Sequence, residues 1–241
     1  MGIADHRTTA SRAHDTLVVF LPGRYSRGDA FVDEGFVAAV RRRNLPVDLV
    51  SADAHWGYYA KRTLERRLHE DVVVPFRKQG YRGLWLVGIS AGAFGALMYD
   101  RSHPGEISGI VALGAFLGTA RVFDDVLVQG GLERWTAPEV IPPGGYELQL
   151  WDYLRGYTDP AQKRPHLIIG YGDRDRFAPA NEILGTALPE GRALSVPGGH
   201  DWDTWRRLWN TLLDSPTLAQ LLVEPPSSST PGPLPPAWDS P

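Results

Sequence analysis

Six short apolar segments recur along the chain, and each is followed by residues that turn a chain. Most are hydrophobic almost without interruption, which is typical of strands buried on both faces of a parallel sheet. They end in Gly, Pro, Ser or Asp, the residues that favour turns. The pattern predicts strands at 16–23, 47–53, 84–90, 109–115, 166–172 and 193–199.

Between these segments, apolar residues recur at the spacing of a helix with one buried face. In the last such stretch, Trp202, Trp205 and Trp209 fall on one side. The expected helices are 29–44, 57–80, 91–104 and 201–214. Strands alternating with helices predict a doubly wound α/β fold, with a mostly parallel sheet and right-handed crossovers.

Three stretches depart from this alternation of strands and helices. Residues 1–15 precede the first expected strand and are expected to be flexible, and residues 16–223 form the domain. Residues 116–164 are expected to be an inserted cap or lid, because ordinary connections are much shorter. Most of its aromatic side chains are expected to pack the insertion itself. Residues 224–241 are rich in Pro and Ser and predict a disordered tail.

The composition narrows the class of protein. A chain of 241 residues, 43% hydrophobic and 22% charged, suits one globular domain with a sizeable core. A net charge of −3 argues against a nucleic-acid partner. The absence of cysteine excludes disulfides, thiolate metal sites and cysteine nucleophiles, and fits a reducing compartment. No apolar stretch resembles a signal peptide or a membrane span, so we expect a cytoplasmic protein.

The stretch "LWLVGISAGAFG" places Ser90 where a buried strand ends and a helix begins. Gly88 and Gly92 have no Cβ, so strand and helix can approach closely across a tight turn. A serine in such a turn is exposed at the carboxyl edge of the sheet, where ligands bind. The amide of Ala91 opens the helix and can stabilise a negative charge beside it. We therefore expect Ser90 to be a nucleophile rather than part of a structural turn.

A serine nucleophile needs a base and a group that orients that base. Of seven histidines, His55 and His200 follow expected strands at the carboxyl edge, whereas His69 falls inside a helix among charged neighbours. His200 is favoured because Gly198 and Gly199 free its loop and because it follows a candidate acid in the chain.

The loop "YGDRDRFAP" offers two acids that could orient the histidine. Asp175 is favoured because it lies further into the loop, while Asp173 can pair with a neighbouring arginine. A second oxyanion amide is expected after the first strand, from Arg24 or, as the alternative, Tyr25. Four residues are expected to line the substrate site: Gly23, Tyr25, His55 and Trp202.

These motifs together resemble the α/β-hydrolase superfamily over residues 16 to 222. "FLPG" resembles its oxyanion loop, "GISAG" its nucleophile elbow, "GDRDRFAP" its acid loop and "GGHDWDTW" its histidine loop. The last motif and "GISAGAFGALMY" are similar to the esterase D and feruloyl-esterase branch. The chain departs from that pattern in its Leu-Pro-Gly oxyanion loop and in a short N-terminal segment, which leaves little room for the usual first antiparallel strands.

The resemblance implies a serine hydrolase with Ser90 as nucleophile, Asp175 as acid and His200 as base. It also implies the amides of Ala91 and Arg24 as the oxyanion hole. The expected reaction is the hydrolysis of a small-molecule carboxylic ester through an acyl-enzyme, with no cofactor and no metal. An acyltransferase or thioesterase using the same residues is one alternative, and a non-catalytic binding protein is another. The oligomeric state cannot be read from the sequence.

Overall fold

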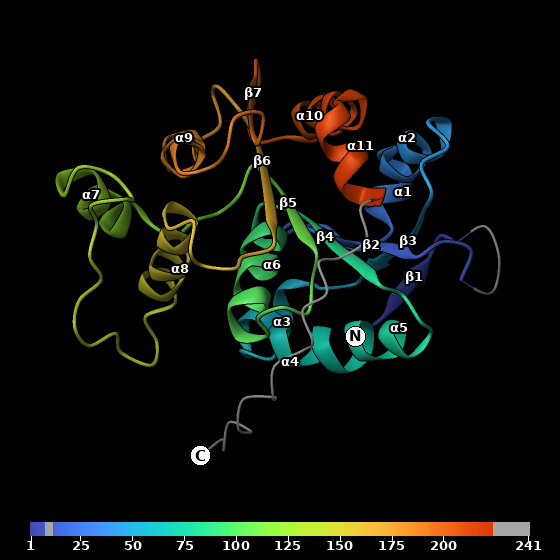
Figure 1. The fold of residues 1–241 in the computed structure, drawn as a ribbon, viewed down its shortest axis with the longest axis horizontal. Helices are drawn as coiled ribbons and strands as arrows, with labels where there is room; N and C mark the ends of the chain where they lie inside the picture. The colour runs from blue at the N-terminus through green and yellow to red at the C-terminus, as the bar shows by residue number, and fades with distance from the viewer. Residues whose placement is uncertain (8–11, 224–241) are drawn as a thin grey trace.

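A twisted seven-stranded sheet runs through the middle of the protein in the order β1-β3-β2-β4-β5-β6-β7 (Figure 1). The computed structural model describes residues 1–7 and 12–223, so the expected tail at 224–241 lies outside the described residues. All neighbouring strands are parallel except β1 and β3. The strands are β1 Ile3–Asp5, β2 Thr16–Leu21, β3 Val47–Ala52, β4 Gly83–Ile89, β5 Gly109–Leu113, β6 His166–Gly172 and β7 Ala193–Val196.

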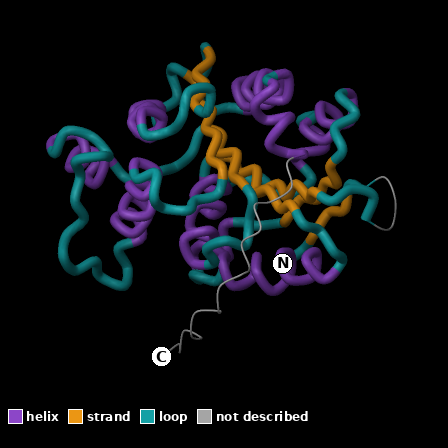
Figure 2. Tube along the Cα trace, viewed as in Figure 1, coloured by secondary structure: helices purple, strands orange, loops and turns teal. Residues whose placement is uncertain are grey.

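Helices cover both faces of this sheet, as Figure 2 shows. One face packs against α1 (Ala30–Asp33), α2 (Phe36–Arg42), α10 (Trp202–Asp214) and α11 (Pro216–Val223). The other packs against α3 (Trp56–Ala60), α4 (Leu64–Leu68), α5 (Val74–Lys78), α6 (Ala91–Ser102), α7 (Ala120–Val128), α8 (Tyr146–Arg155) and α9 (Ala178–Thr186).

Strand β2 shows how the pattern builds these two cores. Leu17, Val19 and Leu21 point to one core and Val18 and Phe20 to the other, because successive side chains of a strand alternate. All five are buried, which is why residues 17–21 are hydrophobic without interruption. The expected doubly wound α/β fold is therefore confirmed. Among the helices that the structure describes, none is long and apolar enough to cross a membrane.

Two of the expected helices are interrupted. The stretch 29–44 divides into α1 and α2 at Gly35, whose φ of 76° is a left-handed conformation that glycine adopts readily. The stretch 57–80 divides into α3, α4 and α5, with a π-helical turn at His69–Val73 directly before α5. Pro75 lacks the N–H that a regular helix would donate there, which accounts for the widened turn before it.

The N-terminal segment contains a strand that the sequence pattern did not predict. Residues Ile3–Asp5 pair antiparallel with β3, and the imidazole Nε2 of His6 lies 2.8 Å from Ser51 Oγ. The expected flexibility therefore does not describe this part of residues 1–15. Three residues are too few to show a hydrophobic period, so only the free edge of β3 identifies the partner.

The expected insertion at 116–164 holds α7, α8 and a 3₁₀ turn at Gly156–Thr158. Helix α8 packs against α6, and Figure 1 shows α7 beside it at the flank of the sheet. Trp135 and Trp151 are buried, and the Trp151 indole donates to the Leu117 carbonyl at 2.8 Å. These two aromatic residues thus pack the insertion itself.

Candidate active site

Ser90 stands between β4 and α6 in a strained backbone conformation. Its φ of 53° and ψ of −112° lie where a residue with a side chain rarely falls, at a cost of about 1–3 kcal/mol. Three hydrogen bonds hold it there. The Ser90 amide donates to the Leu113 carbonyl at 2.9 Å, and the Ser90 carbonyl accepts from the amides of Phe94 at 3.2 Å and Phe116 at 3.3 Å. The turn is therefore fixed by both β5 and α6.

The two glycines that flank Ser90 are required by close backbone contacts. A Cβ on Gly88 would lie 2.4 Å from the Ala93 amide nitrogen, and one on Gly92 would lie 2.1 Å from the Leu21 carbonyl oxygen. Neither backbone atom can move away as a flexible side chain would. The glycine spacing that singled out Ser90 in the sequence thus reflects helix α6 pressing onto β2 and β4.

Ser90, His200 and Asp175 form one chain of hydrogen bonds. His200 Nδ1 lies 2.7 Å from Asp175 Oδ2, and His200 Nε2 lies 2.9 Å from Ser90 Oγ. An ionised carboxylate only accepts hydrogen bonds, so Nδ1 carries the proton and Nε2 accepts from the serine hydroxyl. The Asp175 side chain is fully buried, whereas the His200 ring keeps partial exposure. The three residues predicted from the sequence are therefore brought together.

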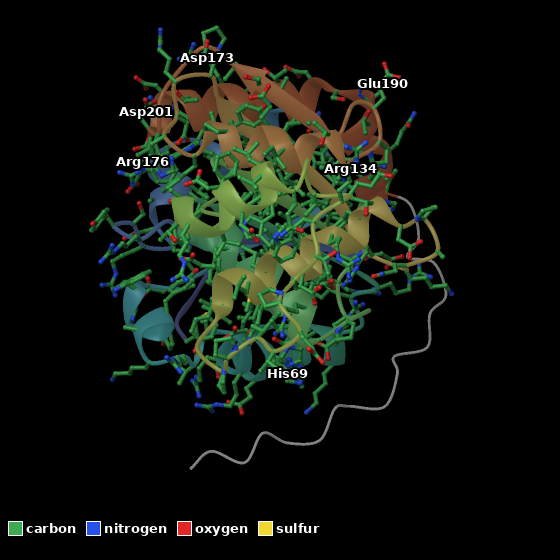
Figure 3. All side chains as sticks on the ribbon, turned by 90° about the vertical axis from the view of Figure 1, so that its left-hand side faces the viewer. His69, Arg134, Asp173, Arg176, Glu190 and Asp201 are labelled. Atoms are coloured by element: carbon green, nitrogen blue, oxygen red, sulfur yellow. The ribbon has the colours of Figure 1, made fainter. Side chains whose placement is uncertain are left out.

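The loops that carry the acid and the histidine are tied to each other. The other oxygen of Asp175 accepts from the Phe177 amide at 2.9 Å. The alternative acid, Asp173, accepts from the Gly198 amide at 2.9 Å and so holds the histidine loop rather than the ring. In Figure 3, Asp173 and Asp201 lie at the same edge of the molecule, where the two loops meet.

Two aromatic side chains that the sequence analysis did not assign to the site flank the His200 ring. The rings of Phe177 and Trp205 each meet it edge to face with centroids 5.0 Å apart. Trp205 is buried, and its indole nitrogen has no hydrogen-bond partner in the described part of the chain. The helical spacing of Trp205 after His200 was visible in the sequence, but the direction in which its ring points was not.

The loop after β2 packs directly against the nucleophile. A Cβ on Gly23 would lie 3.6 Å from Ser90 Cβ, so the following residue, Arg24, begins beside the serine. Within the described residues, the Arg24 amide donates no hydrogen bond. The Ala91 amide opens helix α6, where the first amides lack a partner within the helix. The two amides predicted for the oxyanion hole thus lie on the two segments that meet at Ser90.

A depression of about 370 Å³ continues from this loop. Tyr25 and His55, two of the residues predicted to line the substrate site, both line this depression. The His55 imidazole Nδ1 also accepts from the Gly57 amide at 3.1 Å and caps α3. Trp202 lies elsewhere, with its ring against Phe31 and Phe36 in the core beneath α10. The Trp202 ring contacts Trp205, and Trp205 in turn contacts His200.

His69 is less exposed than its charged neighbours suggested. It lies at the opposite edge of the molecule from Asp173 and Asp201 (Figure 3). Its Nδ1 is 3.1 Å from a Glu106 carboxylate oxygen and 3.2 Å from the Tyr99 hydroxyl, and its ring stacks on His103. Burial lowers the pKa of His103. In residues 1–7 and 12–223, no group of three or more His, Asp or Glu side chains is arranged to hold a metal ion.

No protein-family model matches the chain, and no curated protein matches it in sequence. Solved structures do match in three dimensions. A ferulic acid esterase superposes with a TM-score of 0.58 at 16% identity, covering 88% of this chain and 87% of the esterase. The serine hydrolase FphF of Staphylococcus aureus superposes with a TM-score of 0.61 at 13% identity, covering 90% and 87%. Est1E of Butyrivibrio proteoclasticus gives 0.58 at 17% identity, covering 92% and 93%.

The chain has the α/β-hydrolase fold. In an α/β hydrolase, the nucleophile elbow follows a central strand, and acid and histidine come later in the chain in that order. Ser90 follows the central strand β4, Asp175 follows β6 and His200 follows β7. The α/β-hydrolase architecture therefore accounts for why three residues so far apart in sequence converge, since parallel strands place all their carboxyl ends at one edge.

Proposed function

We propose that the protein is a serine hydrolase that cleaves carboxylic esters of small molecules through an acyl-enzyme. The hydrogen-bond chain from Ser90 Oγ to His200 to Asp175 is the observation that carries this proposal. A serine hydroxyl is a weak nucleophile, and a base at 2.9 Å is what activates it. The strained Ser90 backbone supports the same conclusion, because such strain collects at functional sites.

In the proposed first step, Ser90 Oγ attacks the ester carbonyl while its proton passes to His200 Nε2. Asp175 accepts the Nδ1 proton in a hydrogen bond and stabilises the imidazolium that forms. The tetrahedral intermediate collapses as its C–O bond to the alcohol breaks, and His200 gives its proton to the leaving oxygen. Water then attacks the acyl-enzyme while His200 again takes the proton, and the bond to Ser90 Oγ breaks as His200 returns that proton to Oγ and the acid is released.

The negative charge of the tetrahedral intermediate falls on the former carbonyl oxygen. We assign its stabilisation to the amides of Ala91 and Arg24, which lie on α6 and on the loop after β2, the two segments that meet at Ser90. Such donors are fixed before the reaction starts, so they need no reorganisation, and the loss of one costs on the order of 10²–10³-fold in kcat. Transfer of the acyl group to an acceptor other than water would use the same residues, since the acceptor is chosen outside the triad.

The test is hydrolysis of p-nitrophenyl acetate and butyrate by wild type, Ser90→Ala and Ser102→Ala. Ser102 is a matched control because it lies at the far end of the same helix, where, among the described residues, its hydroxyl bonds only the Met98 carbonyl. We expect activity in wild type and Ser102→Ala and a loss of about 10³-fold or more in Ser90→Ala. Equal activity in all three proteins would refute the proposal.

A fluorophosphonate probe provides a second measurement that does not depend on the choice of ester. We expect it to label wild type and Ser102→Ala but not Ser90→Ala, with the label on the Ser90 peptide. A folded wild type that neither hydrolyses these esters nor takes the label would favour a non-catalytic protein. Labelling without ester hydrolysis would favour transfer to a specific acceptor.

A further inference from the structure

The depression that continues from the loop packed against Ser90 carries a positive charge that the proposed reaction does not use. It is formed by the loop after β2, which brings Arg24 and Arg27, and by the start of α3, which brings Trp56. Arg27 is paired, since its guanidinium lies 2.9 Å from Asp53 Oδ2. Arg24 makes no ion pair with any residue in the described part of the chain. The depression therefore has one uncompensated cation.

Arg24 is held in place by an aromatic ring instead of a carboxylate. The central carbon of its guanidinium lies 4.2 Å from the centroid of the Trp56 ring and 5.4 Å from that of Tyr25. A cation over the face of a ring is attracted by the ring quadrupole. This contact orients the guanidinium while leaving its N–H donors free to bind an anion.

The backbone of Arg24 begins close to the nucleophile. Gly23 packs against Ser90, and consecutive Cα atoms are about 3.8 Å apart, so the Cα of Arg24 lies within about 9 Å of Ser90 Cβ. An ester bound at Ser90 can therefore extend along this loop toward the Arg24 side chain. The single charge matches a single carboxylate, because the second arginine is already neutralised by Asp53.

We propose that the preferred substrates are esters bearing a carboxylate a few bonds from the scissile carbonyl, and that Arg24, stacked on Trp56, binds this carboxylate. The inference rests on the proposed hydrolase function and names its substrate class. Arg24 thus has two separate parts in the site: its amide faces the oxyanion, and its side chain selects the charge of the substrate.

The experiment compares charged esters with neutral partners of similar size. Monomethyl glutarate is paired with dimethyl glutarate for a carboxylate on the acyl side. For one on the alcohol side, 3-acetoxypropanoate is paired with butyl acetate. Proton release in a pH-stat gives kcat/KM for wild type, Arg24→Met, Arg24→Lys and Arg27→Met. The quantity of interest is the ratio of kcat/KM for the charged ester to that for its neutral partner.

We expect wild type to prefer the charged ester in at least one pair. Arg24→Met should lower that ratio about tenfold, the usual size of one charge-assisted contact at a partly exposed site. Arg24→Lys should fall in between, because it keeps the charge and loses the planar fork. Arg27→Met is the matched control and should change the ratio far less, since Asp53 neutralises that charge. The preference should also weaken in about 0.5 M salt.

The neutral esters distinguish a failure of the Arg24 assignment from a failure of the proposed hydrolase function. If Ser90→Ala abolishes hydrolysis of the neutral esters and wild type shows no preference for either charged ester, the hydrolase stands and the assignment of Arg24 is wrong. An equal fall in the ratio for Arg24→Met and Arg27→Met would also overturn it, because the effect would then be general surface charge. If wild type cleaves the p-nitrophenyl esters but no ester in either pair, the inference about Arg24 is overturned; if it cleaves neither set, it is the proposed function that fails.

Discussion

Replacing Asp100 with asparagine tests a buried carboxyl on the helix that carries the nucleophile. Asp100 is 1% exposed on α6, one of its oxygens accepts from the Tyr153 hydroxyl at 2.7 Å, and the other has no partner in the described residues. Burial raises the pKa of Asp100 from 3.8 to about 6, although the hydroxyl of Tyr153 and the charge of Arg164 act against the rise. The folded protein therefore holds this proton more tightly than the unfolded chain does.

The sign and size of the effect follow from that difference in pKa. Below about pH 4, Asp100 is protonated in both the folded and the unfolded state, so its ionisation does not lower the free energy of unfolding. As the pH rises from about 4 to about 6, the unfolded chain ionises first, so the free energy of unfolding falls, and the loss is complete above the folded pKa. A difference of about two units corresponds to about 3 kcal/mol, as an order of magnitude.

The side-chain amide of the Asp100→Asn variant would carry no charge yet still offer an oxygen to the hydroxyl of Tyr153. We therefore expect this variant to be more stable than wild type by up to about 3 kcal/mol near pH 8, and to lose this advantage near pH 4. Urea unfolding across this range measures it, and the difference between the two proteins removes contributions common to both. Asp152→Asn on the surface of α8 is the control and should differ little at any pH. A variant that is less stable than wild type near pH 8, or equally shifted at all pH values, would refute this account.

Three further substitutions test the site's framework. Gly92→Ala forces a Cβ against the backbone at the end of β2, so kcat should fall about 100-fold and the free energy of unfolding by about 1–3 kcal/mol. The control is Gly144→Ala, whose Cβ has room, and it should match wild type in both kcat and stability. Trp205→Phe removes part of the ring against His200, and kcat for p-nitrophenyl acetate should fall about tenfold with KM little changed; a change confined to KM would contradict a positioning role. Asp201→Ala removes the carboxylate that caps α10, so thermal unfolding should show a loss of about 1 kcal/mol, and an unchanged melting temperature would mean that the cap contributes nothing.

The sequence by itself determined the six parallel strands and the nucleophile turn. Most of these strands are nearly continuous apolar runs, and this hydrophobicity is a local property that no distant contact needs to supply. The glycines around Ser90 are equally local, since helix α6 must approach β4 at the point where the chain turns. Strand β1 shows the limit of such reasoning, because three residues carry too little pattern and only the edge of β3 decides their conformation.

Tertiary structure decided which of the candidate side chains come together around His200. Asp173 and Asp175 share one loop and similar neighbours, but only the packing of that loop against the histidine loop turns Asp175 to His200 and Asp173 to the Gly198 amide. Trp202 and Trp205 likewise share one helix face in the sequence, and a three-residue shift sends one ring into the core and the other against His200. The fold also decided the surroundings of the Arg24 side chain, because it set Trp56, 32 positions along the chain, beneath the guanidinium. Side-chain direction depends on neighbours from other strands, and those neighbours exist only once the sheet has formed.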